Sequence, residues 1–550
     1  MKRQKLICGI LLFTLLFSFT GCGTAQTADD IERPASPTSY TNTMPTTESP
    51  TVYVEKEKVY EDYYDNEYPD YYYPNTSGEK YSNIVENGFS SVALSPLSTF
   101  GADVDTASYS NFRRFVEDGY GLYNIPSDAI RVEEMINYFT YNYKEPKKGE
   151  VFGVNATISS CPWNPETNLL SLGINTKSMK DREIPPCNVV FLIDVSGSMS
   201  SHNKLPLIKE AMEMAIENFD GDDRISIVTY ASGVSIVKDG IHGDNHKEII
   251  NAFDSLYASG STFGEAGLET AYEVADSNFI EDGVNRIIIC SDGDFNVGAS
   301  SQSELYKLIS EKRDSGIFLS TLGFGMGNYS DTTMETLADN GNGNYAYIDS
   351  LDEAKKVLVD EMTANLVTVA KDVKLQVEFN PATVSEYRLV GYENRALDAR
   401  DFTDDKKDGG ELGAGHQVTV LYEVKLANGT DPYSNLKYQS KEDNTELSKK
   451  GEIADEYCTL SIAYKDPDAD KSNYLEYPIN VDNYTERPDE DFIFASMVAT
   501  TAMAARNSEY LESCTPDEAL NEVVNTLRKL DLDDEYKEDF YYLVKLLKRN

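Results

Sequence analysis

The stretch from Val189 to Met199 constrains the fold of this chain more than any other. It begins with an uninterrupted apolar run, Val-Val-Phe-Leu-Ile, which is typical of a strand buried on both faces of a sheet. The run ends in Asp194, and Ser196 and Ser198 follow at alternate positions. Open α/β sheets bind ligands at the carboxyl ends of their strands. The stretch therefore predicts a core strand with oxygen ligands at its end, and the alternative is an ordinary Ser/Gly turn.

Residues 185–370 alternate between strand and helix patterns. Apolar strand segments are expected at Val189–Asp194, Arg224–Tyr230, Val234–Lys238, Arg286–Ser291, Ile317–Gly323 and Tyr345–Ile348. Helical periodicity is found at Lys204–Phe219, Lys247–Leu256, Gly264–Phe279, Ser303–Ser315 and Asp352–Val369. Strands that alternate with helices indicate a mostly parallel sheet covered on both faces. We therefore expect a doubly wound α/β domain over this segment.

Two further segments carry polar residues that fit the same site. A second apolar strand is followed directly by Asp292, so it also delivers a carboxylate at its carboxyl end. Thr262 lies in a small-residue loop, Gly-Ser-Thr, just before a predicted helix. Together with Asp194, Ser196 and Ser198 they offer only hard oxygen ligands. Such ligands suit Mg²⁺, Mn²⁺ or Ca²⁺ better than Zn²⁺.

The pattern Asp194-x-Ser196-x-Ser198, followed by Thr262 and then Asp292, resembles the metal-ion-dependent adhesion site of von Willebrand factor A domains. The resemblance implies a divalent cation, with Mg²⁺ first and Mn²⁺ or Ca²⁺ as alternatives. It also implies that the hydroxyls bind the ion while the carboxylates hold coordinated water or switch inward. Two carboxylates roughly neutralise a dication, so the ion can still accept an acidic side chain from a protein partner. The alternative is a site that holds water and only stabilises its loops.

The amino terminus has the layout of a signal peptide. Basic residues precede an apolar run from Leu6 to Thr20, which is about 15 residues long and too short to span a bilayer comfortably as a helix. The run closes in Phe-Thr-Gly-Cys22, which resembles the lipobox of bacterial lipoproteins, although that pattern prefers Leu where Phe19 stands. The resemblance implies removal of residues 1–21, lipidation of Cys22 and an extracytoplasmic protein anchored in the cell membrane.

The remaining regions flank the α/β domain. Residues 22–91 are first Thr/Ser/Pro-rich and then acidic and tyrosine-rich, so they cannot bury enough apolar surface and are expected to form a disordered tether. Residues 92–184 are expected to form a small α+β flanking domain, and residues 371–550 a strand-rich domain with a helical tail. Asp103 and Asp105 precede a helical pattern, so they are expected as helix caps, with metal ligation as the alternative.

The cysteines after the predicted cleavage site are scattered singly. They are Cys161, Cys187, Cys290, Cys458 and Cys514. No CxxC pair suggests zinc binding or thioredoxin-like chemistry. Cys290 lies in an apolar strand and is expected to be a buried thiol. An extracytoplasmic location permits disulfides, and a Cys161–Cys187 bridge is an arrangement that the sequence leaves open.

Charge and motif content narrow the class of function. A formal net charge of -44 disfavours nucleic acid and anionic lipid headgroups as partners. The histidines show no HExxH or paired spacing, and no serine lies in a Gly-x-Ser-x-Gly elbow. We therefore expect an interaction module that is not an enzyme and that binds a protein presenting an acidic residue. The alternatives are an accessory subunit of an envelope enzyme complex, a hydrolase, or a structural envelope protein with an incidental metal site.

Several segments in and around the predicted A domain resemble a bacterial family of A-domain lipoproteins related to YfbK. They are Phe100–Tyr109, Asn342–Asp349, Gly391–Arg395 and Phe402–Asp408. The resemblance covers nearly the whole chain after the predicted tether. It implies that the flanking regions are family-specific domains around the A domain.

Overall fold

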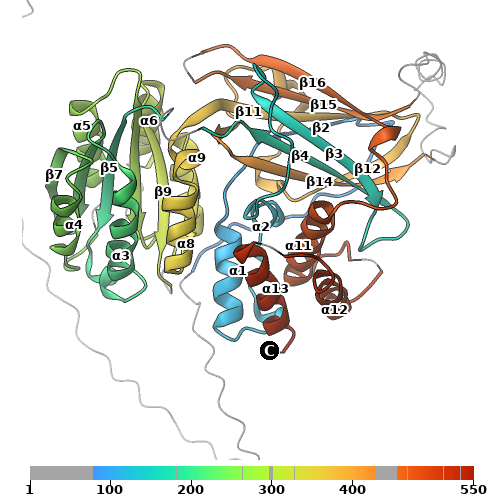
Figure 1. The fold of residues 1–550 in the computed structure, drawn as a ribbon, viewed down its shortest axis with the longest axis horizontal. Coiled ribbons are helices and arrows are strands. Elements are labelled where there is room, and N and C mark those ends of the chain that lie inside the picture. The colour runs from blue at the N-terminus through green and yellow to red at the C-terminus, as the bar shows by residue number, and fades with distance from the viewer. Residues whose placement is uncertain are drawn as a thin grey trace, which may run out of the picture. The chain divides into compact units, whose positions relative to one another are not determined.

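A computed structural model describes residues 79–179, 184–262, 264–295, 302–326, 329–427, 455–467, 469–511, 513–532 and 534–549 of the 550-residue chain. Within these ranges the strands form three sheets (Figure 1). The predicted signal peptide, Cys22 and the predicted tether up to residue 78 lie outside the described residues. Among the helices that the structure describes, none has the length and apolar character needed to cross a bilayer.

A six-stranded sheet organises the middle of the chain, with the order β10-β9-β8-β5-β6-β7. The strands are β5 (Cys187–Asp194), β6 (Arg224–Tyr230), β7 (Val234–His242), β8 (Val284–Ser291), β9 (Phe318–Phe324) and β10 (Tyr345–Ile348). Neighbouring strands are parallel except for the antiparallel pair β6 and β7. All eight residues of β5 are buried, as expected for a strand between two helical layers. The predicted doubly wound α/β fold is confirmed.

Helices cover both faces of this sheet (Figure 1). They are α3 (Leu205–Ala215), α4 (His246–Asp254), α5 (Gly264–Ser277), α6 (Gln302–Asp314) and α7 (Asp331–Asn340). Val189 and Phe191 of β5 belong to the core beneath α3 and α4. Val190 and Leu192 point the other way, into the core beneath α5, α6 and α7. This alternation explains why the strand is apolar at every position up to its end.

The last helix of the A domain differs from the prediction of one helix over Asp352–Val369. The chain instead forms α8 (Leu351–Lys355), a π-helical turn (Lys356–Asp360) and α9 (Met362–Leu366). Strand β11 (Thr368–Phe379) already begins at Thr368, which pairs with Gly413. The helix prediction was therefore wrong at its end, because a strand partner distant in sequence satisfies the backbone of this β-branched segment.

The regions before and after the A domain share one sheet, so the expectation of separate flanking domains is corrected. Its order is β1-β12-β14-β4-β3. The strands are β1 (Ser90–Ser91), β3 (Phe152–Ser160), β4 (Asn168–Thr176), β12 (Val384–Val390) and β14 (Gln417–Leu426). Strands β4 and β14 pair antiparallel from Asn168 opposite Val424 to Asn175 opposite Gln417. The A domain is thus inserted between two segments of a single body.

A second sheet packs on the first and forms a sandwich. It contains β13 (Gly410–Gly413), β11, β15 (Glu456–Lys465) and β16 (Asn473–Asn480) in this order, and β2 (Leu97–Gly101) pairs with β11. Leu172 and Ile174 of β4 share one buried core with Leu375 and Val377 of β11. The sequence did not predict β13 or β16. Two packed sheets of this kind bury the alternate inward residues of both.

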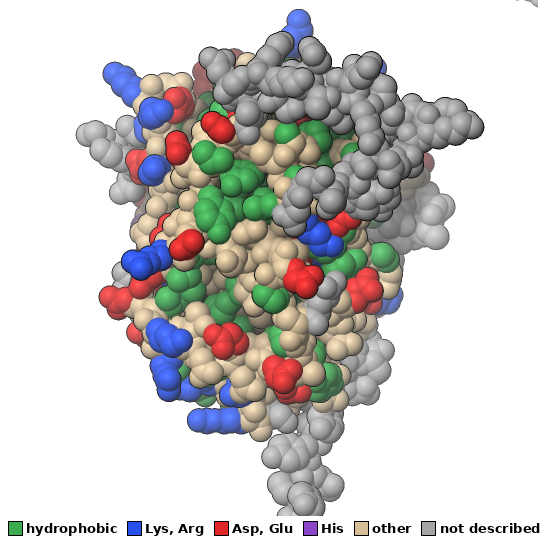
Figure 2. Space-filling model, turned by 90° about the vertical axis from the view of Figure 1, so that its right-hand side faces the viewer, with side chains coloured by type: hydrophobic (Ala, Val, Ile, Leu, Met, Phe, Trp, Pro, Cys, Tyr) green, Lys and Arg blue, Asp and Glu red, His purple; other side chains and the backbone are tan. Residues whose placement is uncertain are grey.

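Helices cover the outer face of the first sheet. They are α1 (Ala107–Glu117), α2 (Val132–Asn137), α11 (Glu490–Arg506), α12 (Pro516–Leu527) and α13 (Glu535–Leu547). Leu169 of β4 and Leu421 of β14 lie in the same core as these helices. The helical tail expected at the end of the chain is present as α11, α12 and α13, and Asp534 caps α13 by accepting the backbone N–H of Tyr536. On the face in Figure 2, acidic and basic side chains are interspersed with small groups of hydrophobic ones.

Asp103 and Asp105 form ion pairs with Arg395 and do not cap α1. Arg395 Nε lies 3.1 Å from Asp103 Oδ2, and Arg395 Nη2 lies 3.0 Å from Asp105 Oδ2. Asp105 Oδ1 also accepts the backbone N–H of Tyr345 in β10 at 2.8 Å. Thr106 occupies the N-cap position without a side-chain capping bond. Asp105 therefore joins the body to β10 of the A domain, and the capping prediction was wrong.

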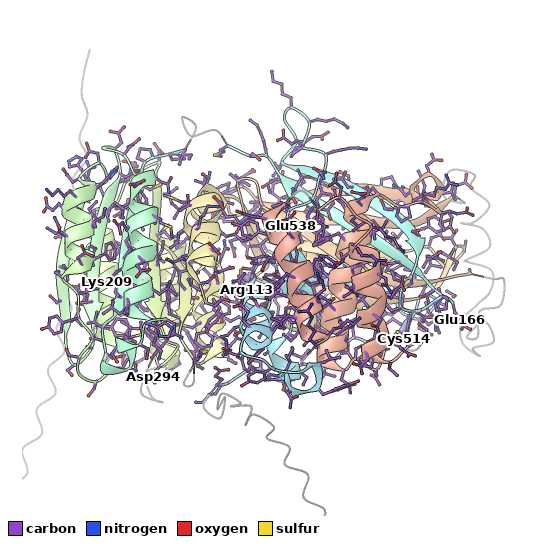
Figure 3. The ribbon with its side chains drawn as sticks, turned by 60° about the horizontal axis from the view of Figure 1, so that its bottom comes forward. Arg113, Glu166, Lys209, Asp294, Cys514 and Glu538 are labelled. Carbon is purple, nitrogen blue, oxygen red and sulfur yellow. The ribbon has the colours of Figure 1, made fainter. Side chains whose placement is uncertain are left out.

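A buried arginine makes a similar link from α1. Arg113 Nε lies 2.8 Å from Asp349 Oδ2, and Arg113 Nη2 lies 2.8 Å from Glu353 Oε2 in α8. Figure 3 labels Arg113 on its helix. Part of the predicted tether is also packed here, since Glu79 pairs with buried Arg114 at 3.0 Å. Residues 79–91 thus belong to the folded body.

The five described cysteines are free thiols. Cys161 lies in the helical core and Cys187 in the A-domain core, so the bridge that the sequence left open is not formed. Cys290 is fully buried, as predicted. Burial raises the pKa of the Cys161 and Cys187 thiols to about 12, so neither is an activated nucleophile at neutral pH.

Candidate metal centre

The two predicted carboxylate ligands lie at the ends of adjacent parallel strands. Asp194 is the last residue of β5, and Asp292 directly follows β8. The strands pair in register up to Ile193 opposite Cys290. Both carboxylate side chains are buried, with no exposed surface. The fold therefore brings together two acidic residues that are distant in the sequence.

The serine pair lies in the turn that follows β5. The backbone N–H of Ser196 donates to Asp194 Oδ1 at 2.8 Å, which fixes the carboxylate. The two hydroxyl oxygens of Ser196 and Ser198 lie 3.0 Å apart. Ser196 is buried, whereas Ser198 is exposed in a short 3-10 turn, Gly197–Ser200. Of these residues, Ser198 is the one that solvent or a partner can reach.

The loop that carries Thr262 is bonded to the serine turn. The N–H of Gly197 donates to the carbonyl of Gly260 at 3.0 Å, and the N–H of Ser259 donates to the carbonyl of Val195 at 2.7 Å. Gly260 has a φ of 85°, a conformation that favours glycine. Thr262 is half-buried just before α5. The backbone thus holds the third predicted segment beside the first.

Burial and neighbouring charges affect both carboxylates of the site. Burial raises the pKa of Asp194 to about 6, the N–H and hydroxyl of Ser196 lower it, and the charge of Asp292 raises it. A buried lysine, Lys204, lies with its Nζ 2.8 Å from Asp292 Oδ2. The sequence pattern does not identify Lys204 as a site residue, because a single lysine before an amphipathic helix matches no metal-site motif. Its ammonium group supplies one positive charge directly beside Asp292.

The residues present fit a divalent cation. Their side chains offer carboxylate and hydroxyl oxygens alone, on loops that backbone hydrogen bonds hold together. Asp294, labelled in Figure 3, continues the loop after β8 and donates its backbone N–H to Asp292 Oδ1 at 3.2 Å. Hard oxygen donors of this kind match Mg²⁺, Mn²⁺ and Ca²⁺.

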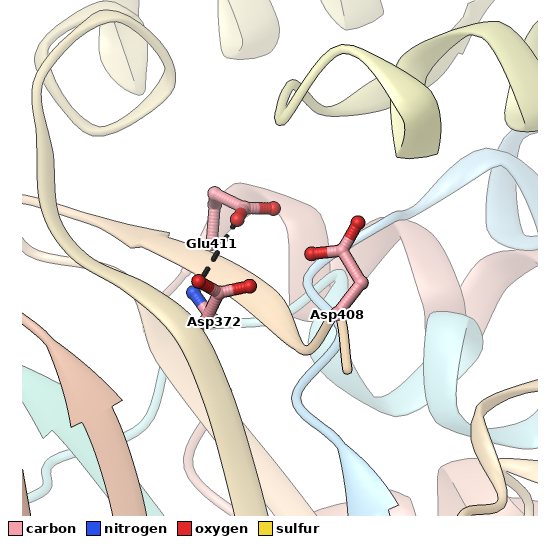
Figure 4. A group of neighbouring side chains, drawn as sticks. All are labelled: Asp372, Asp408 and Glu411. Atoms are coloured by element: carbon pink, nitrogen blue, oxygen red, sulfur yellow. Dashed lines mark hydrogen bonds between the residues drawn. The ribbon is translucent and has the colours of Figure 1, made fainter. Parts of the chain in front are cut away.

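A second acidic cluster, which no sequence motif predicted, lies between β11 and β13 (Figure 4). It consists of Asp372, Asp408 and Glu411, each with a carboxylate oxygen within 4.8 Å of the others. Lys465 Nζ lies 2.6 Å from Asp372 Oδ2, and Arg313 Nη1 lies 2.9 Å from Asp408 Oδ2. Burial raises the pKa of Asp408 to about 7 and that of Glu411 well above its usual value. Lys465 and Arg313 therefore offset part of the negative charge of this cluster.

Comparisons with known proteins agree with this architecture. Residues 188–361 match the von Willebrand factor type A domain, residues 75–171 match a family described as von Willebrand factor, and residues 364–549 match the family described as uncharacterized protein YfbK, C-terminal. The uncharacterized protein YfbK of Escherichia coli K12 is 41% identical over 446 residues, which cover 80% of this chain and 76% of that protein. The chain belongs to the YfbK family. The inferred resemblance to A-domain proteins related to YfbK is confirmed.

Other relatives of this YfbK-family chain share smaller parts of it or lower identity. The mouse inter-alpha-trypsin inhibitor heavy chain H2 is 30% identical over 148 residues, which are 26% of this chain and 16% of that protein. A solved von Willebrand factor type A structure from Catenulispora acidiphila has 15% identity and a TM-score of 0.39, over 74% of this chain and 91% of that one. A von Willebrand factor A domain identifies the chain broadly as a protein-interaction module.

Proposed function

We propose that the protein is a membrane-anchored, extracytoplasmic interaction module that captures an acidic side chain of a partner protein through a divalent cation. Asp194, Ser196, Ser198, Thr262 and Asp292 would hold the ion, with Mg²⁺ preferred and Mn²⁺ or Ca²⁺ as alternatives. The observation that carries the proposal is the meeting of three chain segments at one sheet edge, where buried carboxylates lie beside hydroxyls.

The residues of the proposed site have different structural roles. The N–H of Ser196 holds the Asp194 carboxylate in place, and the bond between Gly197 and Gly260 keeps the two hydroxyl-bearing loops together. Ser198 faces solvent, so a partner approaches the site on its side. When bound, the ion supplies a coordination position that a carboxylate can occupy.

The charge of the chain favours a bridging cation over direct contact with an acidic partner. A protein with a formal net charge of -44 repels acidic surfaces at long range. A divalent ion between two carboxylates converts this repulsion into attraction. Anchoring through a lipid on Cys22 would hold the module on the outer face of the cell membrane, and Cys22→Ser is expected to release the protein from the membrane fraction.

Calorimetric titration of the full-length protein with MgCl₂ or MnCl₂ tests the metal site. Wild-type protein is expected to bind one ion, Asp194→Ala to lose binding and the control Asp222→Ala, at an exposed aspartate outside the site, to keep it. Absence of binding by the wild type, or equal binding by Asp194→Ala, would contradict the proposal.

Crosslinking in the native envelope tests the partner. A protein captured by the wild type but lost on addition of EDTA, and lost equally in Asp194→Ala, is the expected result. A set of crosslinked proteins that is unchanged by chelator and by Asp194→Ala would argue for a structural envelope protein instead.

A further inference from the structure

A cavity of about 340 Å³ lies within the described residues, and none of the proposed metal ligands lines it. Its walls come from the sheet of the A domain, from the helical segment after α8 and from the turn between β13 and β14. The chain at residues 104–106, 137–140 and 178–179 also lines it. Its apolar wall includes Phe191, Ile288, Leu322, Ala346 and Met362. Cavities of a few hundred Å³ with an apolar wall and a few polar groups are typical of small-molecule sites.

Arg286 lies on the polar side of this cavity and is 2% exposed. It is the third residue of β8, so it lies near the amino end of the strand whose carboxyl end leads to Asp292. Asp292 follows Arg286 by six residues, which is roughly 20 Å of extended strand. The cavity is therefore distinct from the proposed metal site.

The hydrogen-bond acceptors of Arg286 are all neutral. Its Nη1 donates to Ser320 Oγ at 2.7 Å, and its Nη2 donates to the carbonyl of Leu366 at 3.4 Å and to Thr368 Oγ1 at 3.3 Å. Its Nε has no hydrogen-bond partner. Burial lowers the pKa of the Arg286 guanidinium to about 10, so the group is still charged at neutral pH.

Other deeply buried arginines of this protein differ from Arg286, because each has a carboxylate partner. These pairs are Arg113 with Asp349, Arg131 with Asp331, and Arg388 with Glu423. Arg286 forms no ion pair with any carboxylate that the structure describes. Buried charges are ordinarily paired, because an unpaired charge in a protein interior carries a large desolvation penalty.

The described acidic residues near the cavity form no ion pair with Arg286. Asp360 pairs with Lys355 at 3.0 Å, and Glu361 pairs with Lys356. The charge of Glu411 raises the pKa of Arg286 without an ion pair, and burial raises the pKa of Glu411 itself well above its usual value.

Neutral hydrogen-bonding groups complete the polar side. Burial, followed by the charges of Arg286 and Lys356, lowers the pKa of His416 to about 3, so its ring is neutral. Its Nδ1 accepts the backbone N–H of Gly413 at 3.0 Å, which leaves the ring proton on Nε2. Asn344 also lines the cavity and donates to Asn365 Oδ1 at 3.0 Å.

We propose that this cavity binds a small amphipathic organic anion, with the anionic head on Arg286 and the hydrocarbon part against Phe191, Ile288 and Leu322. A carboxylate on a short aliphatic chain has the required chemistry, because the guanidinium group pairs with carboxylates and the apolar wall excludes water from the chain. The bound anion would also neutralise the unpaired charge.

Calorimetric titration of the full-length protein with sodium octanoate tests the proposal. The solutions contain EDTA, so that a carboxylate cannot bind through a metal ion at the other site. 1-Octanol serves as the neutral ligand of equal chain length. Wild-type protein is expected to bind one octanoate, at least about ten-fold more tightly than 1-octanol. Absence of octanoate binding, or equal affinity for the two ligands, would overturn the proposal.

Two variants locate the site. Arg286→Met is expected to lose the preference for octanoate, whereas Arg224→Met, at a half-buried arginine of β6 outside the cavity, keeps it. Ala346→Leu fills the cavity and is expected to weaken both ligands. Circular dichroism checks the fold of each variant. Unchanged octanoate binding in folded Arg286→Met, or in folded Ala346→Leu if Arg286→Met does not fold, would refute the assignment.

Discussion

The Nζ of Lys204 lies 2.8 Å from Oδ2 of Asp292, and both side chains are buried at the edge where we propose the metal site. The ammonium group stabilises a carboxylate that would otherwise be unpaired in the protein interior. It also offers a positive charge to the same oxygen atoms that a divalent cation would bind. Lys204 and a bound cation would therefore compete for one carboxylate.

Lys204→Met is expected to bind Mg²⁺ about ten-fold more tightly than the wild type, because the competing positive charge is removed. Without metal, the free energy of unfolding of the variant is expected to be about 3 kcal/mol lower than that of the wild type, because Asp292 loses its ion pair with Lys204. Thermal unfolding with EDTA and with MgCl₂ measures both effects. The exposed Lys247→Met is the control, and an unchanged Mg²⁺ affinity in Lys204→Met would show that the two cations do not compete.

Gly260→Ala is expected to weaken Mg²⁺ binding several-fold and to destabilise the protein by at least about 1 kcal/mol. Gly260 has positive φ, and a Cβ atom there would lie 2.4 Å from Ser232 Oγ. The strain would displace the loop that bonds to Gly197 and carries Thr262. Titration with MgCl₂ checks the affinity. Gly233→Ala, where a Cβ meets no atom within 4 Å, should bind as the wild type does.

The raised pKa of Glu133 predicts that the free energy of unfolding falls as the pH rises. Burial, with the charges of Glu393 and Glu134, raises its pKa to about 8 from a usual value of 4.5. Between these pH values the folded protein holds a proton that the unfolded chain has released. Its contribution to stability is therefore complete below pH 4.5 and declines until the pH passes 8.

Glu133→Gln removes this titration. The variant is expected to be about 1–3 kcal/mol more stable than the wild type at pH 9 and of similar stability at pH 5. Urea unfolding at the two pH values measures the difference. The exposed Glu166→Gln, at a position labelled in Figure 3, should follow the wild type at both. A stability difference independent of pH would count against the raised pKa.

Arg131 forms ion pairs with three buried carboxylates between α2 and α7. Its guanidinium lies 3.0 Å from Glu134, 3.2 Å from Asp331 and 2.9 Å from Glu335. Arg131→Met is expected to destabilise the protein by about 3–5 kcal/mol, because the carboxylates lose their shared cation. Urea unfolding measures the change, with the exposed Arg400→Met as control. A loss below about 1 kcal/mol would mean that the carboxylates are protonated or solvated.

The sequence alone was sufficient for the A domain, because its strands are short apolar runs and its helices have regular periodicity. It also predicted that Asp194 and Asp292 follow two such strands, and parallel strands bring their carboxyl ends to one edge. Both signals are local. The structure agrees with them from β5 to β10, except that α7 (Asp331–Asn340) lies outside the expected helical ranges and that some element ends differ.

Only the tertiary structure decided that β4 pairs with β14 and that Lys204 contacts Asp292. It also decided that Arg286 forms no ion pair with a described carboxylate. Each depends on residues that are distant in the chain: Asn168 pairs with Val424, and Arg286 donates to Ser320. A strand pattern does not name its partner strand, and a lysine or arginine in the sequence does not reveal its burial or the charge beside it. Strand pairing and desolvation are properties of the packed chain, so the sequence pattern could predict the proposed metal site but not the cavity.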